Sequence, residues 1–409
     1  RPVATGGSPA RPYPEQVPHA RIRKTIEAIE PDLIELRRDL HAHPEISWAE
    51  ERTTDAVASW MDKHDISYQR FAPEQSGGTG LVAEVGPAGA PVVALRADMD
   101  ALPVHESTTD PWCSTVPGVS HACGHDVHTA ALVGAAVALA DLHQRNMLPV
   151  RVRMLFQPAE EAMPGGAIRL IAAGVLNSVT RIFALHCDPT LDAGQVGLRE
   201  GAITGASDRV LVRLSGRGGH TSRPHLTEDV TFAAGHLITQ LPAVLSRRLD
   251  PRAGAAMVWG QIQAGEAPNV IPHLAELGGT LRMLDVATWH RAEAIVREII
   301  ADVVRPFGVD VEVTYVRGVP PVVNEFAATE ALRSAVTEAV GQDGVAASLQ
   351  SLGGEDFGWY LETVPGAMGR LGTRTPGGPT YDLHQGTFRA DDRAVAVGAA
   401  VLAHVTLAP

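Results

Sequence analysis

Three apolar runs in the first half of the chain each end in an acid or a histidine, and this repeated pattern constrains the fold most. Residues 91–95 (PVVAL) are followed by RADMD, residues 150–156 (VRVRMLF) by QPAEE, and residues 181–185 (RIFAL) by HCDP. A helical stretch rich in Ala, Leu and Val lies at residues 126–144. Strands that alternate with helices form a largely parallel sheet, which carries its chemistry beyond the carboxyl ends of the strands. The sequence therefore predicts an α/β fold with acids and histidines at one edge of a mostly parallel sheet.

Residues 203–318 follow a different pattern, with the order β-α-β-β-α-β. The strand segments are DRVLVRLSG, AAMVWGQIQAG, AELGGTLRML and VDVEVTYVRG, and helical spacing covers residues 229–247 and 288–304. This is the order of the ferredoxin-like split motif, an antiparallel sheet with two helices on one face. We therefore expect residues 203–318 to be an inserted domain, and residues 21–202 and 319–409 to pack together as one α/β domain.

The N-terminal part of the chain carries two local expectations. Residues 1–20 contain five prolines and no apolar segment of the kind found in signal peptides, which predicts a disordered leader. Residues 21–40 have helical spacing, with Pro31 expected to form a kink or a junction. The sequence does not begin with Met, which leaves a removed signal peptide open.

Composition excludes several classes of partner. The 409 residues include 34 Lys and Arg against 47 Asp and Glu, a net charge of −13. Without a basic block, this charge makes nucleic acid and anionic membranes poor partners. No apolar run reaches the roughly 18 residues that span a bilayer. Three cysteines in so long a chain exclude a disulfide framework and favour a cytoplasmic protein with a free thiol or a thiol metal ligand.

The segment HACGHDVH, residues 121–128, is the first candidate site. Cys123 and His125 can point to one site from a turn, and the N-terminus of the following helix favours a thiolate. Cysteine is also among the most buried residue types, so a structural role stays open on this segment alone.

The adjacent acids Glu160 and Glu161 form the second candidate site. Acids at a strand end usually form a solvated loop, but consecutive side chains there point in different directions. One of the pair can then bind a metal while the other faces the substrate as a general base.

Two further histidines complete a possible ligand set. His186 follows an apolar strand and His384 lies in YDLHQGTF, and either one alone could be structural. With Cys123, His125 and Glu161 they make five donors that suit zinc or a similar divalent ion. Five donors fit two metals that share a bridging ligand better than one catalytic zinc.

Taken together, the motifs of the chain resemble those of a known family. The motifs LRRDLHAHPEISWAEERTT, ALRADMDALPV, HACGHDVHT, FQPAEE, GRGGHTSRPH, APNVIP with GTLR, GGEDF and a late histidine occur in order over nearly the whole chain past residue 20. The chain is similar to the zinc amidohydrolase branch of the aminoacylase/carboxypeptidase metallopeptidases. That branch includes hippurate hydrolases, auxin-conjugate hydrolases and N-acyl-amino-acid aminoacylases.

The resemblance implies a role for each motif residue. It makes Cys123 the bridging ligand of a di-metal site, with His125, Glu161, His186 and His384 as the other ligands, and Glu160 the general base. It also implies that Asp98, Asp100, Glu355 and Asp356 support the site from behind the ligands, and that His41 and His43 are structural. Cys187, directly after His186, departs from the family's pattern.

The resemblance also gives the inserted domain a function in dimerisation and as a lid. His220 corresponds to a residue that stabilises the oxyanion in the active site of a partner chain, in a homodimer or a tetramer. Asn269 and Arg282 match positions for substrate binding, and Arg282 can pair with a free α-carboxylate.

These assignments predict a metal-dependent amidohydrolase that cleaves the amide bond of N-acyl amino acids or similar small conjugates. The implied cofactors are two divalent metal ions, zinc in the first place, with Mn, Co or Ni as alternatives. A carboxypeptidase or dipeptidase would use the same residues and is the main alternative. A binding protein that has lost catalysis would lack Glu160 or a ligand, and all of them are present.

Overall fold

The three strands expected from the apolar runs lie next to one another in an eight-stranded sheet. The computed structural model describes residues 16–408, and the order of strands in this sheet is β1-β2-β4-β3-β5-β16-β6-β15. The strands are β1 (Ser67–Arg70), β2 (Leu81–Val85), β3 (Val92–Asp98), β4 (Arg151–Gln157), β5 (Val179–Asp192), β6 (Val196–Leu198), β15 (Val345–Ala347) and β16 (Gly366–Arg374).

The centre of this sheet is parallel. Strand β3 runs parallel to β4 and β5, and β5 runs parallel to β16, whereas β1, β2 and β4 pair antiparallel. Every residue of β3 is buried, as expected for a strand that is covered on both faces. The predicted α/β class with a large, mostly parallel sheet is confirmed.

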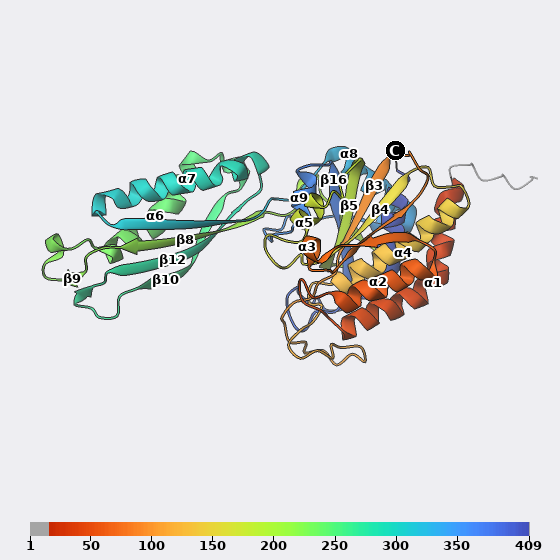
Figure 1. Ribbon diagram of the computed structural model, residues 1–409, viewed down its shortest axis with the longest axis horizontal. Coiled ribbons are helices and arrows are strands. Elements are labelled where there is room, and N and C mark those ends of the chain that lie inside the picture. Colours follow the sequence, from red (N-terminus) through yellow and green to blue (C-terminus); the bar gives the residue numbers. More distant parts are fainter. Residues whose placement is uncertain (1–15, 409) are drawn as a thin grey trace, which may run out of the picture.

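Helices cover both faces of the sheet (Figure 1). Val93 and Leu95 of β3 belong to the larger apolar core, and Ala94 between them belongs to a second core on the opposite face. This alternation is the period of two that a strand imposes on its side chains. The helices of this part are α1 (Gln16–Ala42), α2 (Glu51–Lys63), α3 (Pro73–Ser76), α4 (His125–Gln144), α5 (Ala167–Ala172), α8 (Phe326–Val340), α9 (Gly358–Leu361) and α10 (Arg393–Val405).

Two expectations for the N-terminal part are wrong in part. Helix α1 begins at Gln16, so residues 16–20 of the predicted leader are helical, while residues 1–15 lie outside the described residues. The helix also continues through Pro31, which is not a junction. Contacts with α4 and α10, together with buried side chains such as Ile26 and Leu33 on either side of the proline, offset the backbone hydrogen bond that proline removes.

A second sheet lies between β7 (Gly201–Ala202) and β14 (Val323–Asn324), which pair with each other. Its strand order is β10-β12-β8-β13, all antiparallel, and α6 and α7 pack on it around an apolar core of their own. The elements occur in the expected order and extend away from the eight-stranded sheet (Figure 1). They are β8 (Ala206–Ser215), β9 (Gly219–His220), α6 (Val230–Arg248), β10 (Ala256–Ala264), β11 (Val270–Ile271), β12 (Leu274–Met283), α7 (Val286–Val304) and β13 (Asp310–Val319).

Among residues 16–408, no helix combines the length and the apolar character that crossing a bilayer requires.

Candidate metal centre and active site

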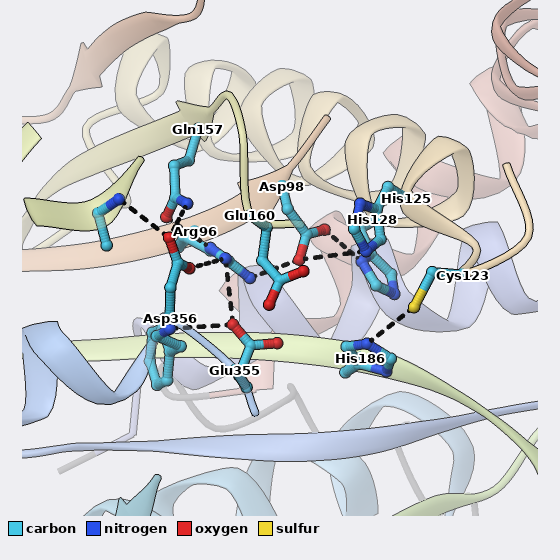
Figure 2. A network of polar contacts seen from close by, with 12 residues as sticks. Arg96, Asp98, Cys123, His125, His128, Gln157, Glu160, His186, Glu355 and Asp356 are labelled. Carbon is cyan, nitrogen blue, oxygen red and sulfur yellow. Dashed lines mark hydrogen bonds and ion pairs between the residues drawn. The ribbon is translucent and has the colours of Figure 1, made fainter. Parts of the chain in front are cut away.

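The turn before α4 places a thiol and an imidazole at the edge of the parallel sheet. Gly124 has φ +81°, and a Cβ atom there would lie 2.7 Å from the Sγ of Cys187, so only glycine fits. The turn leaves the Sγ of Cys123 3.5 Å from the Nε2 of His186, which comes from β5 (Figure 2). His125 is the first residue of α4 and is completely buried.

His186 lies within a strand and not after its end. The sequence pattern ended this strand at Leu185, but β5 continues to Asp192 because β16 pairs with it as far as Arg374. The neighbouring β3 stops pairing with β5 at Ala184, so His186 lies beyond the last residue pair between these two strands. Its Nδ1 contacts the backbone carbonyl of Cys187 at 2.8 Å, which leaves Nε2 for the site.

The turn after β4 holds the two adjacent acids. Ala159 has φ +56°, a left-handed conformation that is uncommon for a residue with a Cβ atom. Glu50 stabilises this conformation by accepting a hydrogen bond from the Ala159 N–H at 2.8 Å. Asp100 accepts the next two backbone N–H groups, those of Glu160 and Glu161, each at 3.0 Å. Two buried carboxylates thus fix three consecutive residues of the turn.

The five predicted ligands come together in two triads that share one residue. The donor atoms of Cys123, His125 and His186 lie within 4.8 Å of one another, and so do those of Cys123, Glu161 and His384. His384 reaches the site from a loop with φ +60°, and its Nε2 lies 3.3 Å from an oxygen of Glu161. The shared position of Cys123 is the one that a bridging ligand needs.

The surroundings of the His125 ring show whether these five donors fit a metal ion. Both of its ring nitrogens are buried and form no hydrogen bond with any described residue. The nearest carboxylate oxygens lie at 3.4 Å in Asp100 and 3.7 Å in Asp98. A buried imidazole without partners is costly unless a ligand completes it, and thiolate, imidazole and carboxylate donors suit a divalent transition metal. The residues therefore fit a metal centre.

The titration behaviour of the donors agrees with this fit. Burial raises the pKa of the Cys123 thiol, and the charge of His125 offsets only part of that effect. Hydrogen bonds with Cys123 and Glu161 raise the pKa of His384 to about 10. Without metal, both groups hold protons that a metal ion must displace.

Glu160 differs from its neighbour in its surroundings. One of its oxygens lies within 4.8 Å of oxygens of Glu355 and Asp356, and one lies within 4.8 Å of a ring nitrogen of His125 and an oxygen of Glu161. Burial, and then the charges of Glu355 and Glu161, raise the pKa of Glu160 well above its usual range. A carboxylate in such surroundings readily takes up a proton.

Three of the acids assigned to supporting roles, Asp98, Glu355 and Asp356, surround a buried arginine that the sequence did not single out. One oxygen of Asp98 accepts a hydrogen bond from the guanidinium group of Arg96 at 2.6 Å, and its other oxygen lies 2.5 Å from the Nδ1 of His128. Arg96 also donates to Asp356 at 2.7 Å and to Gln157 at 2.9 Å (Figure 2).

Sequence reasoning missed His128, Arg96 and Glu50. His128 lies three residues after His125 in one helix, so helical spacing already puts the two on the same side. Arg96 and Glu50 carry no such signal, since their partners are distant in the sequence.

The histidines of LHAHPE lie outside both triads. The Nδ1 of His41 contacts Asp126 at 2.9 Å, and the Nδ1 of His43 contacts the backbone carbonyl of Asp39 at 2.8 Å.

Of the three residues predicted in the inserted segment, His220 and Asn269 lie near each other and Arg282 lies apart from them. His220 lies in β9, which pairs with β11 in a separate two-stranded sheet, remote from the eight-stranded sheet (Figure 1). Asn269 lies beside it, because its carbonyl accepts the N–H of Thr221 at 3.2 Å. Arg282 is at the other end of β12 and donates to the carbonyl of Leu352.

The family model of peptidase family M20/M25/M40 matches residues 94–408, which include both triads and Glu160. The chain belongs to this family. The solved structure of the M20 protein YxeP of Bacillus subtilis, described as a dinuclear metal-binding peptidase, is 34% identical with a TM-score of 0.79, over 93% of this chain and 98% of that chain. The predicted family is confirmed, and a di-metal site agrees with this relative.

Two curated relatives extend the comparison of this M20 chain. The N-acetylcysteine deacetylase of Bacillus subtilis (strain 168) is 36% identical over 92% of this chain and 96% of its own length. A Rhodococcus jostii (strain RHA1) protein that bears a glutamate–cysteine ligase name is 49% identical over 94% of this chain. The M20 chain spans 47%, about half, of that relative's length.

Proposed function

We propose that the chain is a metal-dependent amidohydrolase that cleaves the amide bond of N-acyl amino acids or similar small conjugates. The different surroundings of Glu160 and Glu161 carry the proposal. Glu161 faces Cys123 and His384, whereas Glu160 also approaches the buried acids Glu355 and Asp356. One acid is therefore available as a ligand and the other as a base.

Cys123 would bridge the two metal positions, with His125 and His186 on one side and Glu161 and His384 on the other. Zinc suits a thiolate and imidazole set, and Mn, Co or Ni can bind the same donors. Two bound cations would polarise the substrate carbonyl and acidify a water molecule.

Glu160 takes a proton from the attacking water and returns it to the leaving nitrogen, so that the products are a carboxylic acid and an amine. The turn fixed by Glu50 and Asp100 holds Glu160 in place for both transfers.

We assign residues 203–318 to dimerisation and to a lid. In this arrangement His220 of the partner subunit, with Asn269 beside it, completes the site and stabilises the oxyanion. Arg282 of the same chain binds the substrate carboxylate. The remote position of β9 supports action across subunits, and the exposed Val258 and Ile262 on the edge strand β10 support pairing there (Figure 1).

A hydrolysis screen on protein of measured metal content tests this function. The substrates are N-acyl amino acids of different acyl lengths, with N-acetyl-L-cysteine and hippurate among them, and free dipeptides. Turnover of acyl amino acids above dipeptides supports the proposal, and preference for dipeptides makes the chain a peptidase. No hydrolysis of either class by the metal-loaded protein would reject it.

A further inference from the structure

One carboxylate oxygen of Glu355 has hydrogen-bond and ion-pair partners, and the other has none among the described residues. The residue lies between β15 and α9 and is 3% exposed. Its Oε1 accepts the N–H of Phe357 at 2.9 Å and lies 3.2 Å from a guanidinium nitrogen of Arg96. Its Oε2 is buried and has no hydrogen-bond partner within residues 16–408. In Figure 2 this free oxygen is turned toward the side of Glu160 and His186.

The neighbouring acids make a third metal a poor explanation for this free oxygen. Asp356 already uses both of its oxygens, for Arg96 at 2.7 Å and for Gln157 and the N–H of Ala167 at 2.7 Å and 3.0 Å. Arg96 also brings a positive charge into the cluster. Of Glu355 and Asp356, only the Oε2 of Glu355 therefore remains free among the described residues, which suits a hydrogen-bond donor better than a cation that needs several oxygens.

The position of this acceptor relative to Glu160 indicates which donor it receives. Oxygens of Glu160 and Glu355 lie within 4.8 Å of each other. One nitrogen at about 2.9 Å from each oxygen can therefore contact both. The group that must contact Glu160 during amide hydrolysis is the nitrogen that receives its proton.

We propose that the Oε2 of Glu355 accepts a hydrogen bond from the N–H of the scissile amide and of the amine that leaves, and so selects secondary amides. The inference rests on the proposed amidohydrolase function and adds a specificity residue to it. As the C–N bond breaks, the proton that Glu160 took from water moves to the nitrogen. Glu355 holds that nitrogen through its other N–H and exchanges no proton.

The substitution Glu355→Gln reverses the polarity of the free position. Because Phe357 and Arg96 both donate to the Oε1 position, the amide oxygen of glutamine must occupy it. The NH₂ group then takes the place of Oε2 and presents a donor to the substrate N–H. The change is nearly isosteric, so the shape of the site is preserved.

The experiment compares an N-acetyl amino acid with the matched ester, the O-acetyl 2-hydroxy acid, which lacks the N–H. For Glu355→Gln, kcat/KM on the amide should fall roughly 10- to 100-fold, whereas kcat/KM on the ester should change less than about threefold. Both rates come from one preparation, so an inactive fraction cancels from their ratio. Tyr360→Phe is the matched control, because Tyr360 donates to Gln157 in the same network at 3.0 Å and should affect both substrates equally.

A substrate change tests the same contact in the wild-type protein. N-acetylsarcosine has a methyl group in place of the amide hydrogen of N-acetylglycine and should be hydrolysed at least about tenfold more slowly. Glu355→Gln should reduce that difference.

Equal loss on amide and ester would make Glu355 a structural residue and overturn the inference, and so would an unchanged rate on the amide. Failure of the wild-type protein on every acyl amino acid would instead reject the proposed function.

Discussion

The carboxylate of Asp100 accepts the backbone N–H of Glu160 at 3.0 Å and, through its second oxygen, that of Glu161 at the same distance. One buried side chain thus sets the direction of both a candidate base and a candidate ligand. The two acids have different neighbours: Glu161 approaches Cys123 and His384, whereas Glu160 approaches Glu355 and Asp356, although both also have an oxygen within 4.8 Å of His125. The proposed chemistry depends on this difference in surroundings.

The substitution Asp100→Asn should weaken this turn. An asparagine offers one oxygen, so one of the two backbone N–H groups would face an NH₂ group and stay unpaired. We expect kcat to fall about tenfold or more, in line with the cost of a buried unpaired donor. Steady-state kinetics with saturating metal measure this effect. Ser47→Ala is the control, because it removes only a hydroxyl that donates to Asp100 at 2.6 Å, and an equal loss in that variant would contradict the expectation.

Glu50 should make folding stability depend on pH. Burial, and then the charge of Asp100, raise its pKa from 4.5 to about 7. A carboxyl group with a raised pKa in the folded state stabilises the fold below pH 4.5, and this contribution is lost as the pH rises toward 7. Glu50→Gln should therefore gain stability relative to wild type between pH 4.5 and 7, by up to about 3 kcal/mol.

Urea unfolding of both proteins at several pH values, with a chelator present, measures this gain. The exposed neighbour Glu51 supplies the control, and Glu51→Gln should show no such rise. A difference between Glu50→Gln and wild type that stays constant over this pH range would contradict the assignment.

Cys123 should be required for metal binding. We expect Cys123→Ala to lose at least one metal equivalent and nearly all activity, because both triads contain this thiol. Cys113→Ala should keep both, since Cys113 belongs to neither triad. Metal analysis after gel filtration gives the comparison. Full occupancy in Cys123→Ala would show that another residue bridges or that there is no bridged pair.

His220 should act across subunits. Glu160→Gln and His220→Ala are each expected to be nearly inactive, since a missing oxyanion donor costs about 10²- to 10³-fold in kcat. When the two variants are folded together, half of the dimers are mixed and each mixed dimer holds one intact site. Activity should then recover to roughly a quarter of wild type for closed two-fold dimers. No recovery, with mixed dimers shown to be present, would place His220 in the site of its own chain.

Several candidate ligands could be predicted because apolar runs in the sequence mark the strands, and polar residues follow directly where each run ends. Parallel strands place their carboxyl ends at one edge of the sheet, so polar residues after separate strands meet there. The place of Cys123 and His125 before a helix made them candidates but left a structural role open, and their assignment as ligands came from the family resemblance. The adjacency of Glu160 and Glu161 already suggested two different tasks. Even the early end assigned to β5 did not matter, because His186 lies beyond the last residue pair between β3 and β5.

The contacts that position these ligands could not be predicted in the same way. Glu50 supports Ala159 across 109 residues, and Arg96 reaches Asp356 across 260, and neither pair has a local pattern that identifies it. The continuation of α1 through Pro31 depends likewise on packing against α4 and α10 and not on helix propensity.

The division of labour between Glu160 and Glu161 is tested most directly by measuring metal content and turnover of an N-acyl amino acid in Glu160→Gln and Glu161→Gln. We predict that Glu160→Gln keeps its metal and loses at least roughly 10²-fold in kcat, as expected for a lost general base, whereas Glu161→Gln binds less metal. Near-normal turnover in metal-loaded Glu160→Gln would contradict the assignment of Glu160 as the base.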